Sequence, residues 1–255
     1  MKEIKVAPPA NSSSGHHKTE YMKKFILVLL VCLAGAALPL PGAVSAQVDL
    51  VSRYVWRGFD LLPDNHAAIQ PSLTIDFGES GFSLNVWSSF ALAHRDVFKR
   101  ADEIDVTLAY AFKMPEGWEL SAGLINYGYW FADDFKFEDH ATQEVYATVA
   151  RTDLPLSPQL SVYYDFNLGS GLYVTLGGSH ELKVNEKVSM EIGGLIGFNS
   201  RQYIDTTGFS DIDLYAKVPL TMGKLTLTPS LNVMIPLLDE VNEDTEIWFG
   251  FSAAI

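Results

Sequence analysis

Charged residues recur at even spacings along much of this chain. Arg53 and Arg57 lie four positions apart, and Asp211 and Asp213 lie two apart. In a β-strand, such spacings put side chains on one face. If the strands enclose a space, facing rows of basic and acidic groups would orient polar solutes in it. The alternative is that the rows pair into salt bridges that plug and stiffen the space. The candidate lining residues are Arg53, Arg57, Asp76, Glu103, Asp105, Glu119, Asp165, Glu191, Asp211 and Asp213.

Histidine and serine offer a second chemistry, the hydrolysis of lipids. His94, His140 and His180 are the available bases. None of the three lies in a local motif with a serine, and Gly169-Ser170-Gly171 fits a tight turn better than the sharp turn that exposes a serine nucleophile. We therefore expect no catalytic residues and no enzyme, and a lipid hydrolase remains an alternative.

Metal and cofactor chemistry has little support in the sequence. The acidic segments 133–139 and 239–244 hold clustered oxygen atoms, but they lack the fixed spacing and the glycine of a calcium loop. The only cysteine, Cys32, lies in an N-terminal apolar run, which leaves no thiol in the rest of the chain. We expect no metal and no cofactor.

The N-terminus has the pattern of an export signal. Lys23 and Lys24 precede an apolar run, and the small residues before Ala46 form a cleavage site. We expect residues 1–21 to be an upstream extension outside the mature protein, 22–46 a signal peptide cleaved near Ala46, and 47–255 the folded domain. Removing the five lysines and two acidic residues of 1–46 changes the net charge from −13 to −16. An acidic chain repels phosphates, so nucleic acid is excluded as a partner.

The remaining chain alternates apolar and polar residues over segments of about ten residues. In 103–112, for example, Ile104, Val106 and Leu108 share one face while Glu103 and Asp105 share the other. Behind an export signal, this alternation predicts an all-β fold, an antiparallel up-and-down transmembrane β-barrel of about twelve strands in the bacterial outer membrane. The predicted strands are 48–59, 68–77, 82–93, 103–112, 118–130, 142–151, 159–167, 172–182, 187–198, 211–221, 224–235 and 245–255.

The predicted connections alternate in length, as short periplasmic turns and longer outer loops do. Segments 152–158 and 168–171 break the rule, because the first is long for a turn and the second is short for a loop. A slip of the strand assignment around 150–170 would account for both.

Aromatic residues give an independent measure of the membrane. Trp118 and Trp130 share a face twelve positions apart, a separation of ~28 Å along the membrane normal for a tilted strand. Tyr54 and Trp56 fall near the end of the first predicted strand. We interpret these four residues as parts of two girdles, although aromatic residues also favour strands in general.

The first three predicted strands carry the segments Ser52-x-Tyr54-x-Trp56-Arg57-Gly58-Phe59, Ile69-Gln70-Pro71-Ser72-Leu73 and Ser80-Gly81-Phe82-Ser83-Leu84-Asn85-Val86-Trp87-Ser88-Ser89. This stretch resembles the TorF-like porins, a family of bacterial outer-membrane proteins formerly described as conserved hypothetical proteins. The resemblance implies an outer-membrane barrel of porin type, with no established substrate and no catalytic residues. Asp60 and Leu61 stand where a Ser-Gln step is common in that family.

These observations predict an outer-membrane channel for the passive diffusion of small polar or cationic solutes. A plugged structural barrel is the main alternative. The expected partners are outer-membrane lipid and lipopolysaccharide, the barrel assembly machinery, small polar solutes and further copies of the chain in a homo-oligomer.

Overall fold

The computed structural model describes residues 42–62, 66–94, 102–129, 141–186 and 188–255. Nearly all regular structure in these ranges is β-strand. The long strands are β1 (Val44–Val51), β4 (Ala68–Asp76), β5 (Phe82–Ala91), β6 (Glu103–Ala111), β7 (Trp118–Tyr129), β8 (Ala141–Arg151), β9 (Gln159–Asp165), β10 (Gly171–Lys183), β11 (Ser189–Ser200), β12 (Thr207–Lys217), β14 (Leu225–Pro236) and β15 (Glu246–Ala254). Short elements are β2 (Val55–Trp56), β3 (Phe59–Asp60), β13 (Leu220–Met222) and the 3-10 turn η1 (Gly78–Ser80).

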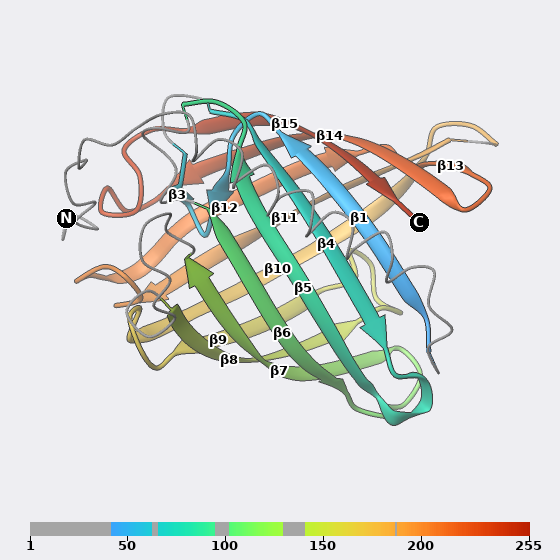
Figure 1. Cartoon of the computed structure of the whole chain (residues 1–255), viewed down its shortest axis with the longest axis horizontal. Coiled ribbons are helices and arrows are strands. Elements are labelled where there is room, and N and C mark those ends of the chain that lie inside the picture. The colour runs from blue at the N-terminus through green and yellow to red at the C-terminus, as the bar shows by residue number, and fades with distance from the viewer. Residues whose placement is uncertain (1–41, 63–65, 95–101, 130–140, 187) are drawn as a thin grey trace, which may run out of the picture.

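The long strands close into a barrel. Each pairs in antiparallel fashion with its neighbour along the chain, from β4 to β12. The ring is completed because β1 pairs with both β4 and β15, and β14 pairs with both β15 and β12 (Figure 1). Among the described residues, this gives twelve strands around the wall, with β13 as a short addition beside β14, and confirms the predicted fold class. The same residues contain no helix long and apolar enough to cross a membrane.

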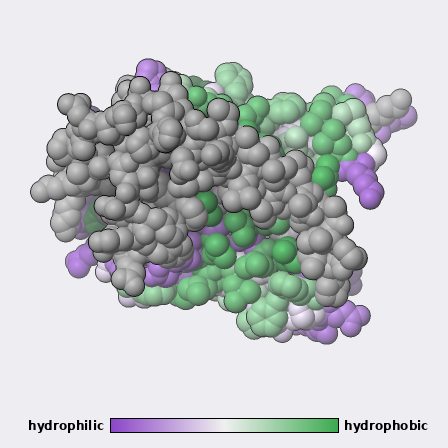
Figure 2. All heavy atoms as spheres, in the orientation of Figure 1, coloured by the Kyte–Doolittle hydropathy of each residue, from purple (hydrophilic) through white to green (hydrophobic). Residues whose placement is uncertain are grey.

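The two faces of the wall differ as the alternation predicts. On β6, Val106 and Leu108 are 39% and 47% exposed, whereas Glu103 and Asp105 are 3% and 8% exposed. Apolar residues of the other strands are exposed in the same way, and Figure 2 shows them gathered on the visible part of the wall. The barrel therefore has an apolar outside and a polar inside, as a lipid-embedded barrel requires.

The two ends of the barrel have different connections. One end, here the turn end, holds the start of β1, the C-terminus and the links 77–81, 112–117, 152–158, 184–188 and 218–224. The opposite end, here the loop end, holds residues 52–62, 66–67, 92–94 and 102 and the links 166–170, 201–206 and 237–245. β8, β9 and β10 begin and end within two residues of the predicted strands, so these two unusual links are real and no slip occurs between 150 and 170.

Two strands differ from the prediction. The tenth predicted strand, 211–221, is instead β12 at Thr207–Lys217. The first predicted strand, 48–59, is instead β1 at Val44–Val51, because the chain leaves the wall after Val51 and turns inward. Ala46 lies within β1, where its backbone N–H and C=O bond to Ile255, so the expected cleavage site falls inside this strand.

Candidate lumenal site

The segment after β1 folds into the barrel as a hairpin. Val55 pairs with Asp60 and Trp56 with Phe59 in a two-stranded sheet that is separate from the wall. Its tip is Arg57-Gly58, with φ values of 50° and 84°. Two positive φ values in a two-residue link fit the twist of a hairpin, and glycine at the second position adopts one without strain. We call residues 55–60 the lumenal hairpin.

Arg57 connects the hairpin tip to the wall. Its Nη1 and Nη2 donate to Oε2 and Oε1 of Glu144 on β8, each over 2.7 Å. Nη1 also donates to Oε1 of Gln202 over 2.6 Å. The Glu144 side chain is fully buried, and that of Arg57 is 7% exposed. A buried bidentate pair with further hydrogen bonds is the geometry in which an arginine–carboxylate interaction is strongest.

Aromatic rings enclose the same guanidinium. Its Cζ atom lies 4.4 Å from the ring centre of Tyr163, 4.8 Å from that of Tyr173 and 4.5 Å from that of Trp56. Such distances allow cation–π attraction. Tyr163 lies directly opposite Tyr146 and Tyr173 on the neighbouring strands, so the three tyrosines form a belt across β8, β9 and β10. Contacts with this many wall strands are possible only from inside the barrel.

Other hydrogen bonds hold the wall side of this site. The Tyr127 hydroxyl donates to Oε1 of Glu144 over 2.9 Å, and Nε2 of Gln202 donates to its Oε2 over 2.8 Å. The Tyr173 hydroxyl donates to Asp211 over 2.8 Å. We call Arg57 and its wall partners the Arg57 cluster, which consists of Arg57, Tyr127, Glu144, Tyr163, Tyr173 and Gln202.

A second set of contacts holds the base of the hairpin. Arg53 forms ion pairs with Asp60 and with Glu246 on β15. The Tyr54 hydroxyl donates to Glu103 over 2.9 Å, and its ring lies 5.7 Å from that of Trp87. Both predicted arginines are therefore inside the barrel, where they pair with acidic groups as the salt-bridge alternative expects.

The loop end covers the hairpin tip. Asn242 donates from Nδ2 to the Gly58 carbonyl over 3.4 Å, and a Cβ on Gly58 would lie 2.5 Å from Val241. Glu240 in the same loop accepts hydrogen bonds from the backbone N–H groups of Asp205 and Thr206 and from the Thr206 hydroxyl. These bonds hold the pKa of Glu240 below its usual value. The loops 201–206 and 237–245 thus hold each other above the hairpin.

The other predicted lining residues divide into two groups. Asp105, Asp165, Asp211 and Asp213 lie on the inner face near the loop half, and Asp165 binds Thr142 and Tyr203. Glu191 lies farther toward the turn end, where it accepts from Tyr215 over 2.8 Å and pairs with Lys217 at 3.3 Å.

Asp76 and Glu119 do not join these residues. Both are exposed at the turn end, and Asp76 accepts a hydrogen bond from the Gly78 N–H over 2.6 Å. Each stands near the end of its strand, where the side chain reaches the solvent at the turn end of the barrel.

The predicted aromatic girdle is wrong for two of its four members. Tyr54 and Trp56 lie inside the barrel, because they follow the point at which the chain leaves the wall. Trp118 is exposed at the turn end, where Arg151 lies 4.5 Å from its ring centre. Trp130 falls outside the described residues.

The residues considered for catalysis lie apart. His94 packs edge-on against His66 at the loop end, with ring centres 4.5 Å apart, whereas His180 is near the turn end of β10. Asp165 accepts hydrogen bonds from the backbone N–H groups of Gly169 and Ser170, which makes this segment a tight turn. His140 and the acidic segment 133–139 lie outside the described residues.

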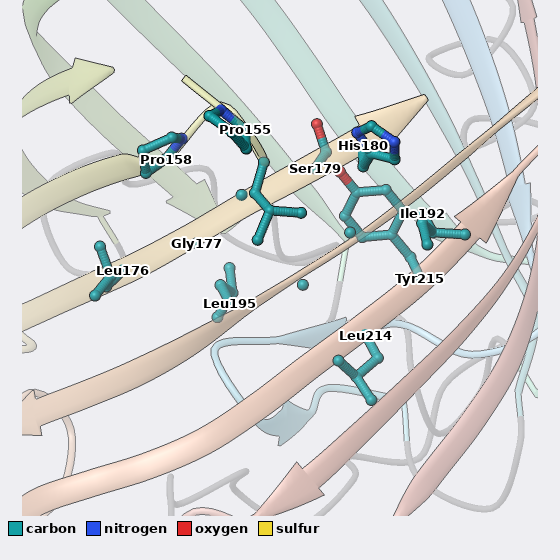
Figure 3. A pocket seen from close by; sticks show the side chains of 14 residues that line it. Pro155, Pro158, Leu176, Gly177, Ser179, His180, Ile192, Leu195, Leu214 and Tyr215 are labelled. Atoms are coloured by element: carbon teal, nitrogen blue, oxygen red, sulfur yellow. The ribbon is translucent and has the colours of Figure 1, made fainter. Parts of the chain in front are cut away.

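His180 belongs to a groove in the wall. The groove is lined by β10, β11, β12 and the link 152–158, and Figure 3 shows Leu176, Leu195 and Leu214 from the three strands. Glycines let neighbouring side chains approach here, since a Cβ on Gly193 would lie 2.5 Å from Tyr215. Gly177-Gly178 on β10 and Gly193-Gly194 on β11 thus permit close packing in the wall, as expected for strand glycines.

Acidic groups dominate the buried charges. Among the described residues, seven acidic residues are classed as buried and Arg57 is the one buried basic residue. The Arg57–Glu144 and Arg53–Glu246 pairs cancel two of these negative charges. The interior of the barrel therefore attracts cations and repels anions.

The fold and this interior define a transmembrane-type β-barrel with a polar, acid-rich lumen and a hairpin folded into it. The chain belongs to the family described as a bacterial protein of unknown function (Gcw_chp), which matches residues 34–214. A comparison with curated proteins gives no match.

Solved porins share the fold. The chain is similar to the KdgM porin, with a TM-score of 0.54 and 10% identity over 82% of this chain and 97% of that one. It is also similar to the NanC porin, with a TM-score of 0.51 and 10% identity over 84% of this chain and 99% of that one. A structure of the KdgM porin in complex with disordered oligogalacturonate gives a TM-score of 0.50 at 10% identity, over 83% and 96% of the two chains. At these identities the likeness concerns the fold alone.

Proposed function

We propose that this protein is an outer-membrane channel through which small polar or cationic solutes diffuse passively. The observation that carries the proposal is the lumen, which is closed to lipid by a twelve-stranded wall and lined by buried carboxylates in excess over arginine. Charge of one sign along a pore selects against ions of that sign. The lumenal hairpin narrows this path on the side of the loop end.

The proposal includes the setting of the barrel. The apolar outer face supports insertion into outer-membrane lipid, with the loop end toward lipopolysaccharide and the turn end toward the periplasm. Cleavage of the export signal near Ala46, insertion by the barrel assembly machinery and association into homo-oligomers are further parts of the proposal. So is membership of the TorF-like porins, which rests on the segment 52–89. No enzymatic role is proposed.

Planar bilayers test the proposed function. The folded protein is inserted into a bilayer between KCl solutions of unequal concentration, and single-channel currents and the reversal potential are recorded. We expect discrete conductance steps and a reversal potential toward the K⁺ equilibrium value. A reversal potential toward the Cl⁻ value would contradict the assigned role of the lumenal carboxylates.

A plugged structural barrel is the second candidate, and the hairpin favours it. The Arg57 cluster spans from the hairpin to four neighbouring wall strands, and such pairs stiffen a barrel. The same bilayers distinguish the two. A folded wild-type protein that passes no current, together with a conducting Arg57→Ala variant, would establish the plug.

A further inference from the structure

We propose that the wall side of the Arg57 cluster is a binding site for guanidinium-bearing solutes, and that Arg57 occupies it as a tethered internal ligand. The inference deepens the proposed function, because it names a class of solute that the channel recognises. It also holds for a barrel that does not conduct, since binding to the wall requires only access to the lumen.

The wall residues match the shape of a guanidinium. Glu144 presents both carboxylate oxygens to two adjacent nitrogens, and Gln202 presents a carbonyl oxygen to one of them. The rings of Tyr163 and Tyr173 lie within 5 Å of the central carbon. A planar fork that meets a carboxylate, with aromatic rings around it, is recognition that an ammonium ion cannot reproduce.

The same residues keep their positions through contacts that do not involve Arg57. Glu144, Tyr163 and Tyr173 stand on β8, β9 and β10, whose backbones pair in register. Gln202 is fixed by its backbone N–H, which donates to Asn199 over 2.8 Å, and by its carbonyl, which accepts from Asn199 over 3.0 Å. These four residues, Glu144, Tyr163, Tyr173 and Gln202, form a cup that is organised before a guanidinium enters it.

The hairpin that supplies Arg57 is a separate unit. Its two strands contain two residues each and pair only with each other among the described residues. A hairpin of this size has little stability of its own. The tip can therefore leave the wall without breaking any backbone hydrogen bond of the barrel.

Without Arg57, no positive charge would balance the buried carboxylate of Glu144, and the site would favour binding of another cation. The Glu144 side chain is fully buried, and without Arg57 it would keep the hydrogen bonds from Tyr127 and Gln202 but lose the positive charge beside it, which is strongly destabilising for a buried carboxylate. A free guanidinium that replaces Arg57 would restore both hydrogen bonds and the ring contacts. An anionic solute would be repelled by Glu144, and a neutral solute would not supply the positive charge.

The test uses the full chain with methylguanidinium as the probe and methylammonium as a cation of equal charge. Binding to the folded, detergent-solubilised protein is measured by titration calorimetry, and block of single-channel current is measured in bilayers. We expect Arg57→Ala, in which the site is empty, to bind methylguanidinium at least about tenfold more tightly than methylammonium, because only a planar guanidinium can donate to both Glu144 oxygens from two adjacent nitrogens. Arg57→Ala/Glu144→Gln should lose this preference.

Arg151→Ala is the matched control. Arg151 also lies over an aromatic ring, that of Trp118, and donates two hydrogen bonds of 2.8 Å to one carboxylate, that of Asp153. This pair is exposed at the turn end, where such interactions contribute little. We expect this variant to gain no saturable methylguanidinium binding.

The outcomes separate the two proposals. Equal binding of both probes by Arg57→Ala, or no binding to a folded variant, overturns the site whether or not the channel conducts. Absence of current from every variant, with selective binding retained, overturns the channel and leaves the site. If Arg57→Ala does not fold, the test is hydrogen exchange of the hairpin residues 55–60 in the wild-type protein. A guanidinium that displaces Arg57 releases the hairpin, so methylguanidinium must accelerate this exchange more than methylammonium does. Equal exchange rates with the two probes overturn the site.

Discussion

Arg57 and Glu144 are 87 positions apart in the sequence, and two hydrogen bonds of 2.7 Å join their side chains inside the barrel. One residue is at the tip of a hairpin that the chain folds into the lumen, and the other is on the wall. The pair therefore determines where the hairpin rests. It also places a positive charge in the middle of an acidic interior.

We expect the lumenal carboxylates that lack an arginine partner to set the preference of the channel for cations over anions. One carboxylate oxygen of Asp105 and one of Asp213 are buried without a hydrogen-bond partner among the described residues. We expect Asp105→Asn/Asp213→Asn to lower the ratio of K⁺ to Cl⁻ permeability, because two acidic groups leave the lumen. Reversal potentials in a KCl gradient measure this ratio. Asp153→Asn, at the exposed turn end, is the control and should leave it unchanged.

The contact between two loops depends on the ionisation of Glu240. Because its pKa is lowered in the folded protein, the stabilisation that Glu240 gives is complete above the ordinary glutamate pKa of 4.5 and is lost as the pH falls through the lowered value. We expect hydrogen exchange at Asp205 and Thr206, corrected for the intrinsic effect of pH, to accelerate in acid. Glu240→Gln should show the faster exchange at neutral pH. Unchanged protection from exchange in this variant would show that Glu240 does not hold the two loops together.

The two faces of the wall should respond in opposite ways to a new charge. Leu124 is exposed on the outer face of β7, and Thr107 lies on the inner face of β6, opposite Ile125. Leu124→Lys should destabilise the folded barrel in lipid by about 2–4 kcal/mol, because lysine near the bilayer midplane is costly. Thr107→Lys should cost much less, since the lumen is polar. Equilibrium unfolding in lipid vesicles measures both, and equal losses would contradict the assignment of the two faces.

Much of the wall follows from the sequence, because a period of two is a direct consequence of a sheet with one apolar face. The alternation of Ile104, Val106 and Leu108 with Glu103 and Asp105 predicted both the strand and its orientation. The same period-of-two argument gave the wrong end for the first predicted strand. Tyr54, Trp56 and Arg57 continue an alternation that looks like a strand, but they form a hairpin inside the barrel. The sequence holds only part of a hairpin signal: Gly58 suits a position with positive φ, but Arg57 is not one of the residues typical before such a glycine.

The Arg57 cluster could be predicted only in part. Arg57 was expected in the lumen, whereas Tyr127, Glu144, Tyr163, Tyr173 and Gln202 were not singled out. Glu144 and Tyr163 alternate with apolar residues in their strands, which marks them as inward-facing. Their meeting point could not be derived in this way, because it depends on the stagger between strands and on how far the hairpin reaches. Gln202 lies in a loop that bends inward, and no periodicity indicates this.

The single-channel conductance of Arg57→Ala, compared with wild type in the same bilayers, tests the central claim most directly. If the hairpin, held by Arg57 on Glu144, sets the narrowest part of the path, the variant should conduct at least about twofold better, because loss of the pair frees the hairpin tip to move away from the wall. Equal conductance from two equally folded proteins would contradict the claim that this hairpin controls passage through the barrel.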